Sequence, residues 1–193
     1  MAMKIAGAVL AGGRSRRFGR DKALALLGGR PLIYWSLEAI RPAAQVLAIN
    51  GPKTLADRLD LPSVGDFPGA APGPLAGLLG AMIWAAALGC SHILTAPCDT
   101  PFLPSDMAAK LVDAIGERSV IAARAGRVHA LCAIWRTDLA EPMTPVAHQP
   151  DQPSLQRIID DLAGGYVDFE DEARFANLNT PAEMIAAQDR WVG

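Results

Sequence analysis

Hydrophobic residues in this chain fall into short apolar runs that alternate with longer segments of helical spacing. Residues 4–10 are apolar on both faces, as in a central strand of a parallel sheet. Further strands of the first half are expected at residues 46–49, 63–65 and 92–96. Helices are expected between and after them, at residues 31–40, 53–59, 75–88 and 105–115, with Ser105 as the N-cap of the last. The alternation predicts an α/β fold with a mostly parallel sheet and helices on both faces.

The second half of the chain departs from strict alternation. Residues 120–123 and 128–135 flank an Arg-Ala-Gly-Arg turn and predict a hairpin, and residues 141–153 form a polar connection that contains prolines. The remaining expected elements are a helix at 155–162 capped by Ser154, a strand at 166–169, an extended segment at 175–177 and a helix at 181–191. No repeat or long linker divides the chain, so a single domain over residues 1–193 is expected.

Composition narrows the class of protein. The chain has 193 residues, of which 51% are hydrophobic, and a formal net charge of −2, which gives no general attraction to nucleic acid or to a membrane surface. No apolar run approaches the roughly 18 residues of a membrane span. Cys90, Cys98 and Cys132 match neither a metal motif nor a disulfide framework, which favours buried thiols in a reducing compartment, and we expect a cytoplasmic protein.

A glycine-rich basic stretch follows the first strand. Residues 10–22 read Leu-Ala-Gly-Gly-Arg-Ser-Arg-Arg-Phe-Gly-Arg-Asp-Lys. Its cations cannot be buried unpaired, and backbone N–H groups of a glycine-rich loop bind phosphates well. No Gly-Lys-Ser/Thr follows and the spacing is not GxGxxG, so neither a Walker loop nor a dinucleotide fingerprint is present. The segment predicts a phosphate-binding loop, and an exposed basic turn is the alternative.

Polar residues follow the other predicted strands of the first half. Asn50, Asp66 and Asp99 each come directly after a strand, and the carboxyl ends of parallel strands share one edge of the sheet. Asn50 alone could be a turn residue and Asp66 a cap. Asp99 lies between Pro97 and Pro101, which stiffen its loop, and a carboxylate opposite a phosphate loop suits Mg²⁺. A structural carboxylate that accepts backbone N–H groups is the alternative for Asp99.

Four ordered motifs carry a resemblance to a known family. Residues 10–22 are similar to the signature of nucleotidyltransferases that activate a small phosphorylated substrate with a nucleoside triphosphate. Gly-Pro-Leu-Ala-Gly-Leu at 73–78, Pro-Cys-Asp-Thr-Pro-Phe at 97–102 and Asn-Leu-Asn-Thr-Pro at 177–181 narrow the resemblance. Together they resemble the bacterial molybdenum cofactor guanylyltransferases, which transfer GMP onto molybdopterin, and this implies a three-layer αβα Rossmann-like nucleotidyltransferase fold.

The resemblance also implies roles for individual residues. The N-terminal part would supply the GTP and Mg²⁺ site, and the C-terminal part would contribute to the molybdopterin pocket. Implied GTP-binding residues are Leu10, Ala11, Gly12, Gly13, Lys22, Asn50, Asp66 and Asp99. Asp99 would ligate Mg²⁺, Lys22 would bind phosphate, and Asn177 and Asn179 would lie on the pterin side. Gly13 is the second glycine of Leu-Ala-Gly-Gly, which matches the guanine type of the loop. Cytidine enzymes of the family tend to carry Leu-Ala-Ala-Gly instead.

The implied reaction is attack by the terminal phosphate of molybdopterin, or of Mo-molybdopterin, on the α-phosphorus of GTP, with release of pyrophosphate. A phosphate monoester is largely ionised at neutral pH, so no general base is needed, and Lys22, Asp99 and Arg16 are the expected catalytic groups. His92, His129 and His148 are scattered and are expected to be structural. Proteins that deliver the cofactor or mature molybdoenzymes are possible partners.

Three other functions remain open from the sequence. A molybdopterin cytidylyltransferase or a related sugar-phosphate nucleotidyltransferase would use the same motifs. A GTP-binding adaptor without catalysis would require a degraded site, whereas Lys22 and Asp99 are both present. A purely structural α/β domain would leave the polar residues at four strand ends unexplained.

Overall fold

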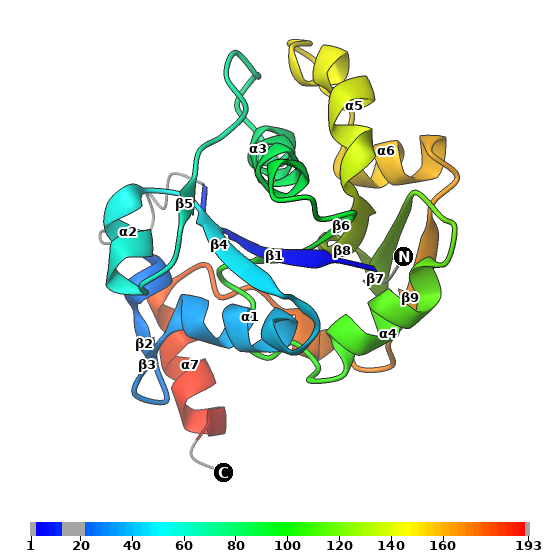
Figure 1. The fold of residues 1–193 in the computed structure, drawn as a ribbon. Helices are drawn as coiled ribbons and strands as arrows, with labels where there is room; N and C mark the ends of the chain where they lie inside the picture. Colours follow the sequence, from blue (N-terminus) through cyan, green and yellow to red (C-terminus); the bar gives the residue numbers. More distant parts are fainter. Residues whose placement is uncertain (1–2, 13–21, 192–193) are drawn as a thin grey trace.

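A seven-stranded sheet forms the centre of the molecule, in the order β5-β4-β1-β6-β8-β7-β9 (Figure 1). The computed structural model describes residues 3–12 and 22–191. The sheet strands are β1 (Ile5–Leu10), β4 (Val46–Asn50), β5 (Ser63–Val64), β6 (His92–Pro97), β7 (Val120–Ala125), β8 (Arg127–Arg136) and β9 (Gly165–Asp168). All neighbours pair in parallel except those of β8, which is antiparallel to β6 and β7. The mostly parallel sheet is therefore confirmed.

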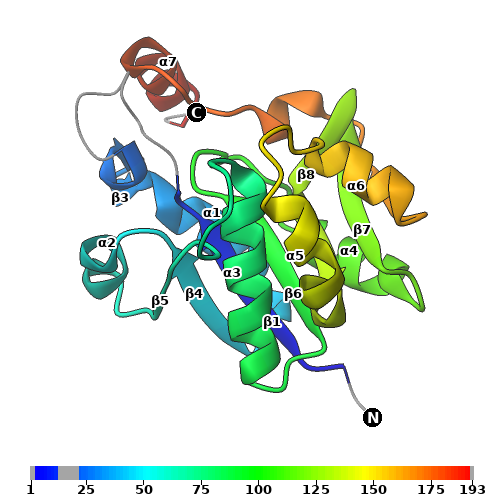
Figure 2. The same ribbon diagram turned by 90° about the horizontal axis from the view of Figure 1, so that it is seen from above.

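Helices cover both faces of the sheet, as the sequence predicts. On one face lie α3 (Pro74–Ala87), α5 (Ala140–Ala147) and α6 (Leu155–Asp161) (Figures 1 and 2). On the other lie α1 (Leu32–Ile40), α2 (Lys53–Arg58) and α4 (Met107–Ile115). Strand β1 supplies both cores, since Ile5 and Val9 pack on one side and Ala6, Ala8 and Leu10 on the other. The architecture is a three-layer αβα fold with a mostly parallel sheet.

Smaller elements complete the chain. A hairpin of β2 (Leu26–Leu27) and β3 (Arg30–Pro31) turns at Gly28 and Gly29, which both have positive φ. This hairpin and α1 form a third apolar cluster with α7 (Pro181–Trp191). Short 3₁₀ helices are η1 (Lys22–Leu24), η2 (Arg41–Ala43), η3 (Thr137–Leu139) and η4 (Glu172–Phe175). The C-terminal helix thus packs beside the segment that follows residues 10–22.

The polar connection predicted at residues 141–153 is wrong in its first half, which is helix α5. Pro142 lies in the first turn, where a backbone N–H has no helical partner. Pro145 lies inside the helix and cannot donate to the carbonyl of Glu141, but the Thr144 hydroxyl donates to that carbonyl at 2.8 Å. The Thr144 bond therefore satisfies the carbonyl that Pro145 leaves without a helical donor, and the apolar face of α5 packs on α3.

Two further expectations are corrected. Ser105 is not an N-cap: α4 begins at Met107 after Asp106, whose carboxylate pairs with Lys110 at 2.8 Å instead of capping the helix. The segment expected to be extended at 175–177 begins within η4, which ends at Phe175. The N-cap at Ser154 is confirmed, because its hydroxyl accepts from the Arg157 N–H at 3.1 Å.

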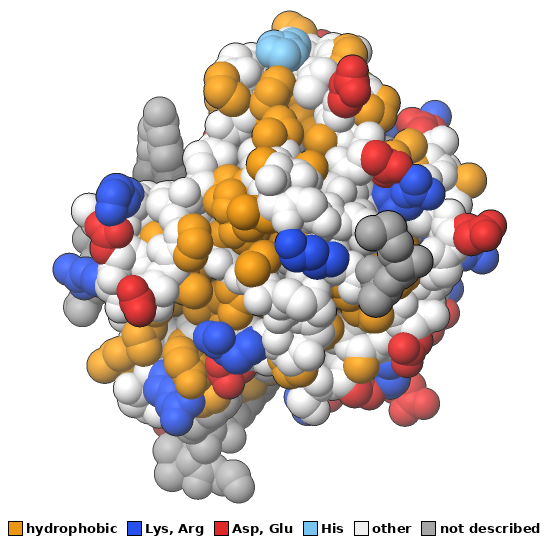
Figure 3. Space-filling view, viewed as in Figure 1, with side chains coloured by type: hydrophobic (Ala, Val, Ile, Leu, Met, Phe, Trp, Pro, Cys, Tyr) orange, Lys and Arg blue, Asp and Glu red, His pale blue; other side chains and the backbone are white. Residues whose placement is uncertain are grey.

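The surface carries charges of both signs. On the face in Figure 3, basic and acidic side chains lie interspersed around a band of hydrophobic ones, consistent with the net charge of −2. Within residues 3–12 and 22–191, no helix is long and apolar enough to cross a membrane. Cys90, Cys98 and Cys132 are free thiols; Cys90 and Cys132 are buried as expected, whereas Cys98 is only partly buried. The single domain over residues 1–193 and the cytoplasmic location stay predictions.

Candidate active site

The carboxyl ends of four neighbouring strands bring the predicted site residues to one edge of the sheet. Leu10 at the end of β1 pairs with Asn50 at the end of β4 and with Pro97 at the end of β6. Beyond the strands the backbones stay joined: the Ala11 N–H donates to the Asn50 carbonyl at 2.8 Å, and the Cys98 N–H donates to the Leu10 carbonyl at 3.2 Å. Asp99 therefore follows a residue that is bonded directly to the first strand.

A cavity of about 1100 Å³ opens at this edge. It lies between the ends of β1, β4 and β5 and the N-terminal part of α3. Its lining is Leu10, Ala11, Gly12, Asn50, Gly51, Pro52, Gly65, Asp66, Pro72, Gly73, Pro74, Gly77 and Leu131. All of the predicted GTP-binding residues that the structure describes, except Lys22 and Asp99, line this cavity. Its volume is sufficient for a ligand of nucleotide size.

Asn50 and Asp66 form the polar floor of the cavity. The Asn50 amide nitrogen donates to the Asp66 carboxylate at 3.0 Å and to the Val64 carbonyl at 3.2 Å, and Asn50 is only 1% exposed. These bonds fix the Asn50 amide, so its oxygen faces the backbone of Gly12 and Gly77. A side chain at Gly77 would place its Cβ 2.4 Å from that oxygen. Glycine is required at position 77 because helix α3 approaches the Asn50 side chain so closely.

Lys22, Asp99 and Asn179 converge at the loop after β6, and the residue before Asp99 is hydrogen-bonded to Leu10 of the cavity lining. The Lys22 ammonium donates to the Asp99 carboxylate at 2.7 Å and to the Asn179 amide oxygen at 2.9 Å. The Lys22 side chain is 8% exposed and that of Asp99 is 18% exposed. Asp99 and Asn179 are 80 positions apart in the chain. Their oxygens together hold one buried positive charge. We refer to these three side chains as the charge cluster.

The C-terminal motif packs on the loop that carries Asp99. The Leu178 N–H donates to the Asp99 carbonyl at 2.9 Å, and the Thr100 hydroxyl donates to the Asn177 amide oxygen at 3.3 Å. Leu178 itself is buried in the apolar cluster with α7. Of the two predicted pterin-side residues, the structure therefore joins Asn179 to the charge cluster and Asn177 to Thr100.

Two predicted site residues, Gly13 and Arg16, lie outside the described residues. The three histidines are not part of the cavity lining or of the charge cluster. Burial lowers the pKa of His92 and of His129. The His148 ring packs edge-on against Phe67, with the ring centroids 5.4 Å apart. Burial raises the pKa of the Cys132 thiol, and the nearby Asp99 charge raises it further, so this thiol stays protonated. None of these four groups has the position of a nucleophile or base at the cavity.

The described residues include no group of three or more His, Cys, Asp or Glu side chains that could hold a metal by themselves. The charge cluster offers one carboxylate and one amide oxygen that already surround a cation, the Lys22 ammonium. Hard oxygen donors of this kind fit Mg²⁺, which is commonly held by one or two carboxylates together with substrate phosphates and water. The donor set fits a shared metal site that a phosphate ligand would complete.

The sequence did not single out Gln152 or Leu131. The Gln152 amide donates to the Ala147 carbonyl at 2.5 Å and to the Ala71 carbonyl at 3.4 Å. It thereby joins the end of α5 to the loop before α3, whose residues 72–74 form a wall of the cavity. Leu131 reaches the cavity from β8. Neither has a local sequence signal, because each depends on the path of a segment distant in the chain.

A family model fits this architecture. The model described as "MobA-like NTP transferase domain" matches residues 7–165, which include the cavity and all but Asn179 of the charge cluster. The chain belongs to the MobA-like NTP transferase family. This confirms the resemblance drawn from the four motifs, and with it the assignment to the nucleotidyltransferase enzymes.

Curated relatives extend the match over almost the whole chain. A protein of Cereibacter sphaeroides named molybdenum cofactor guanylyltransferase is 37% identical over 190 residues, with 96% of each chain covered. A protein of the same name from Rhodobacter capsulatus is 38% identical over 194 residues and 97% of each chain. The C-terminal Asn-Leu-Asn-Thr-Pro motif, outside the family model, therefore lies within the aligned length of these relatives.

Solved structures share the fold. Molybdopterin-guanine dinucleotide biosynthesis protein A of Archaeoglobus fulgidus superposes with a TM-score of 0.73 over 96% of this chain and 97% of that one, at 22% identity. A 4-diphosphocytidyl-2C-methyl-D-erythritol synthase of Anaerococcus prevotii superposes with a TM-score of 0.74 over 99% of both chains, at 11% identity. At these identities the likeness establishes the fold of the sheet and its helices.

Proposed function

We propose that this protein transfers GMP from GTP to the terminal phosphate of molybdopterin or Mo-molybdopterin, with release of pyrophosphate and formation of the guanine dinucleotide cofactor. The observation that carries the proposal is the charge cluster, which lies next to a nucleotide-sized cavity. The family membership and the names of relatives up to 38% identical over nearly the full chain support it.

In this proposal the cavity binds the guanosine part of GTP. The backbone of residues 10–12 and the fixed amide of Asn50 present polar atoms at its floor, and Asp66 adds an acceptor. The triphosphate then extends toward Lys22, because Cys98, the residue before Asp99, is bonded to Leu10 at the cavity floor. The nucleotide would therefore span from a cavity whose one charged lining residue is Asp66 to the Lys22–Asp99 pair, where bound Mg²⁺ would add positive charge.

Asp99 and Asn179 are the residues that would hold Mg²⁺, together with phosphate oxygens of the nucleotide. When bound there, Mg²⁺ would supply positive charge that offsets the repulsion between two phosphorylated substrates. A bound phosphate offers Lys22 a new partner, so its ammonium can leave Asp99 and Asn179 for the phosphate at no net loss of ion pairing. The charge cluster would thus be the resting arrangement of the site.

The protein's own part in the reaction is to position and to neutralise. An oxygen of the terminal molybdopterin phosphate forms a bond to the α-phosphorus as the bond to the pyrophosphate oxygen breaks. The attacking phosphate is already ionised near neutral pH, so no side chain has to remove a proton. Lys22 would stabilise negative charge on the phosphates. Asn177, bonded to Thr100, and Asn179, bonded to Lys22, would face the acceptor in this proposal.

The decisive experiment is a transfer assay with purified protein. The protein is incubated with molybdopterin, Mg²⁺ and either GTP or CTP, and pyrophosphate and the pterin dinucleotide are measured. We expect pyrophosphate to appear in step with the guanine dinucleotide, only when molybdopterin is present, and much faster with GTP. Faster turnover of CTP would identify a cytidylyltransferase instead. GTP binding without pyrophosphate release would identify a non-catalytic adaptor.

A further inference from the structure

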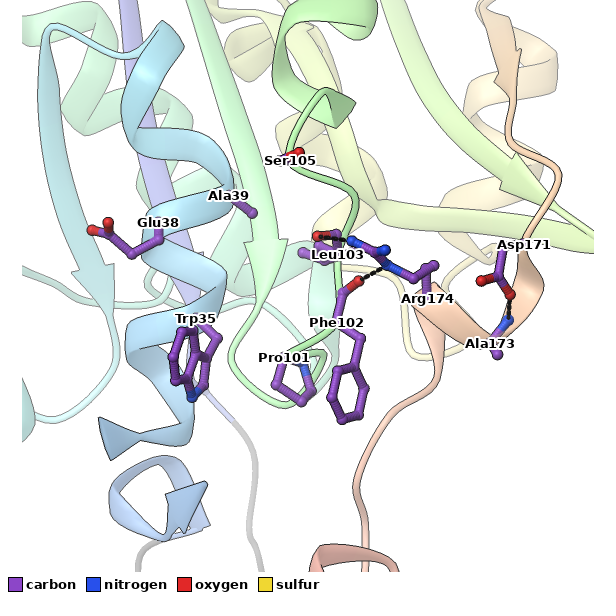
Figure 4. Close-up of a pocket in the computed structure, with 10 residues that line it drawn as sticks. All are labelled: Trp35, Glu38, Ala39, Pro101, Phe102, Leu103, Ser105, Asp171, Ala173 and Arg174. Atoms are coloured by element: carbon purple, nitrogen blue, oxygen red, sulfur yellow. Dashed lines mark hydrogen bonds between the residues drawn. The ribbon is translucent and has the colours of Figure 1, made fainter. Parts of the chain in front are cut away.

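The loop that carries Asp99 is flanked by a second cavity. This cavity, of about 540 Å³, lies between α1, residues 101–105 and the segment around η4 (Figure 4). Trp35, Glu38 and Ala39 line it from α1, and Pro101, Phe102 and Leu103 line it from the loop. The loop therefore borders an open volume along this side, while the Leu103 side chain is buried in the core. Side-chain hydrogen bonds add to this packing in fixing the main chain between Asp99 and α4, among them one from the Ser36 hydroxyl to the Thr100 carbonyl at 3.5 Å.

Arg174 makes such a contact. Its Nε donates to the Phe102 carbonyl at 2.6 Å, and its Nη2 donates to the Leu103 carbonyl at 3.5 Å. Figure 4 shows the guanidinium reaching from η4 across to the loop. A charged donor forms stronger hydrogen bonds than a neutral one, and the planar guanidinium presents its N–H groups in a fixed geometry. One side chain thereby holds two successive carbonyls of the Asp99 loop.

Arg174 itself projects from a well-anchored turn. The Asp171 carboxylate accepts from the Ala173 N–H at 3.0 Å and so caps η4. The next residue, Phe175, is fully buried, stacks on His129 with ring centroids 4.6 Å apart and contacts Phe169 at 5.2 Å. The backbone of Arg174 is therefore fixed to β8 and to the end of β9 before its side chain reaches the loop.

The segment after Arg174 contacts the same loop at two further residues: Asn177 accepts from Thr100, and Leu178 donates to the Asp99 carbonyl. The next residue, Asn179, accepts from Lys22, which also pairs with Asp99. We call residues 174–179 the strap. It meets the loop at its far end through Arg174 and at the charge cluster through Asn179, so the position of Asp99 depends on both ends.

We propose that Arg174 is a positioning residue for the nucleotidyl-transfer site, which holds the Asp99 loop against the strap through the carbonyls of Phe102 and Leu103. Its effect on catalysis rests on the proposed function, whereas its effect on the loop does not. Arg174 touches neither the nucleotide cavity nor the charge cluster, and it acts through the main chain of the loop. No sequence motif includes it.

The test compares Arg174→Ala and Arg174→Lys with the control Arg157→Ala, which removes an exposed arginine that pairs with Asp161 on α6. The direct readout is hydrogen exchange of the Leu178 amide, which donates to the Asp99 carbonyl, and of peptides covering residues 98–106. We expect roughly tenfold faster exchange there in Arg174→Ala and an intermediate rate in Arg174→Lys, which keeps the charge but not the fork. Exchange in Arg157→Ala should equal that of the unsubstituted protein.

The kinetic readout uses the transfer assay. We expect Arg174→Ala to raise the Mg²⁺ concentration for half-maximal velocity and to lower kcat by about tenfold, with the KM for GTP little changed. A general loss of stability would instead lower the active fraction and leave the Mg²⁺ dependence unaltered. If Arg174→Ala does not fold, the Lys variant carries the same comparison.

Two failures can be told apart. If the unsubstituted protein transfers no nucleotide, the proposed function fails, and the exchange measurement still tests the placement of the loop. If exchange and Mg²⁺ dependence in both Arg174 variants match those of Arg157→Ala, the inference about Arg174 is overturned even when transfer is robust.

Discussion

Only 7% of Lys22 is exposed, and Asp99 and Asn179 supply two oxygens within 2.9 Å of its side-chain nitrogen. A buried charge without partners would be far more costly than the ion pair. The pair also places a carboxylate and an ammonium one residue after Cys98, which is bonded to Leu10 of the cavity lining. Each member of the charge cluster can therefore be tested both for stability and for function.

For Asp99 we expect Asp99→Asn to lower GMP transfer by at least about 100-fold while the circular-dichroism spectrum stays native. The amide keeps the shape and an acceptor oxygen for Lys22 but removes the negative charge that would attract a divalent cation. Full transfer by Asp99→Asn would exclude a charge-dependent role for this carboxylate.

Lys22→Ala should raise the KM for GTP and lower the free energy of unfolding by about 2 kcal/mol, since Asp99 loses its partner.

Gly77 is a second residue with a sharp prediction. An alanine Cβ at this position would lie 2.4 Å from the Asn50 amide oxygen, so Asn50 or the start of α3 must move. We expect Gly77→Ala to weaken GTP binding by tenfold or more, measured by calorimetry, because the cavity floor is displaced. Ala86→Ser, on the exposed face of the same helix, is the matched control and should bind GTP normally. Unchanged affinity in Gly77→Ala would show that the floor is not part of the binding site.

At the scale of elements, the wall of the 1100 Å³ cavity depends on a contact between α5 and the loop before α3. The Ala71 N–H donates to the Ala147 carbonyl at 2.9 Å, and Gln152 bonds to the carbonyls of both residues. We expect Gln152→Ala to raise the KM for GTP several-fold with kcat nearly unchanged, because the wall loosens while the charge cluster stays intact. Steady-state kinetics check this, with the exposed Gln149→Ala as control. A fall in kcat alone would contradict it.

For the whole molecule, histidine burial sets the expected pH dependence of stability. Burial lowers the pKa of His129, and Arg127 acts in the same direction, while the Ala125 carbonyl and Glu172 oppose it. Burial and Arg136 lower the pKa of His92, against Asp138. In the unfolded chain both imidazole rings are half-protonated near pH 6.5. At that pH the same rings in the folded protein bind fewer protons, because their pKa values are lowered.

The free energy of unfolding should therefore be fully retained above pH 6.5 and should fall as the pH decreases through 6.5 toward the lowered pKa values of the folded state. Urea unfolding between pH 8 and 5 measures this dependence. His129→Gln should flatten the slope, whatever its effect on stability at pH 8. A slope that is identical with and without His129 would show that this ring contributes nothing to the dependence.

Most of the architecture could be predicted from local patterns. Apolar runs with turn signals gave β1, β4 and β6, and the Gly126 turn between two strands gave the antiparallel pair of β7 and β8. Helix α5 was missed because Pro145 contradicts a helical pattern unless the Thr144 hydroxyl bonds to the Glu141 carbonyl. That hydrogen bond joins a side chain to the backbone, and the spacing of apolar residues does not predict it.

The sequence by itself determined the family, the sheet with its covering helices, and the strand ends after which Asn50, Asp66 and Asp99 lie. Those features follow from apolar periodicity, turn residues and short motifs, which are local. Only the tertiary structure decided that Lys22 bonds to Asp99 and Asn179, that Gly77 must be glycine and that Arg174 reaches the Asp99 loop. These contacts join residues far apart in the chain, so their geometry exists only once the sheet, α3, η4 and the strap have packed together.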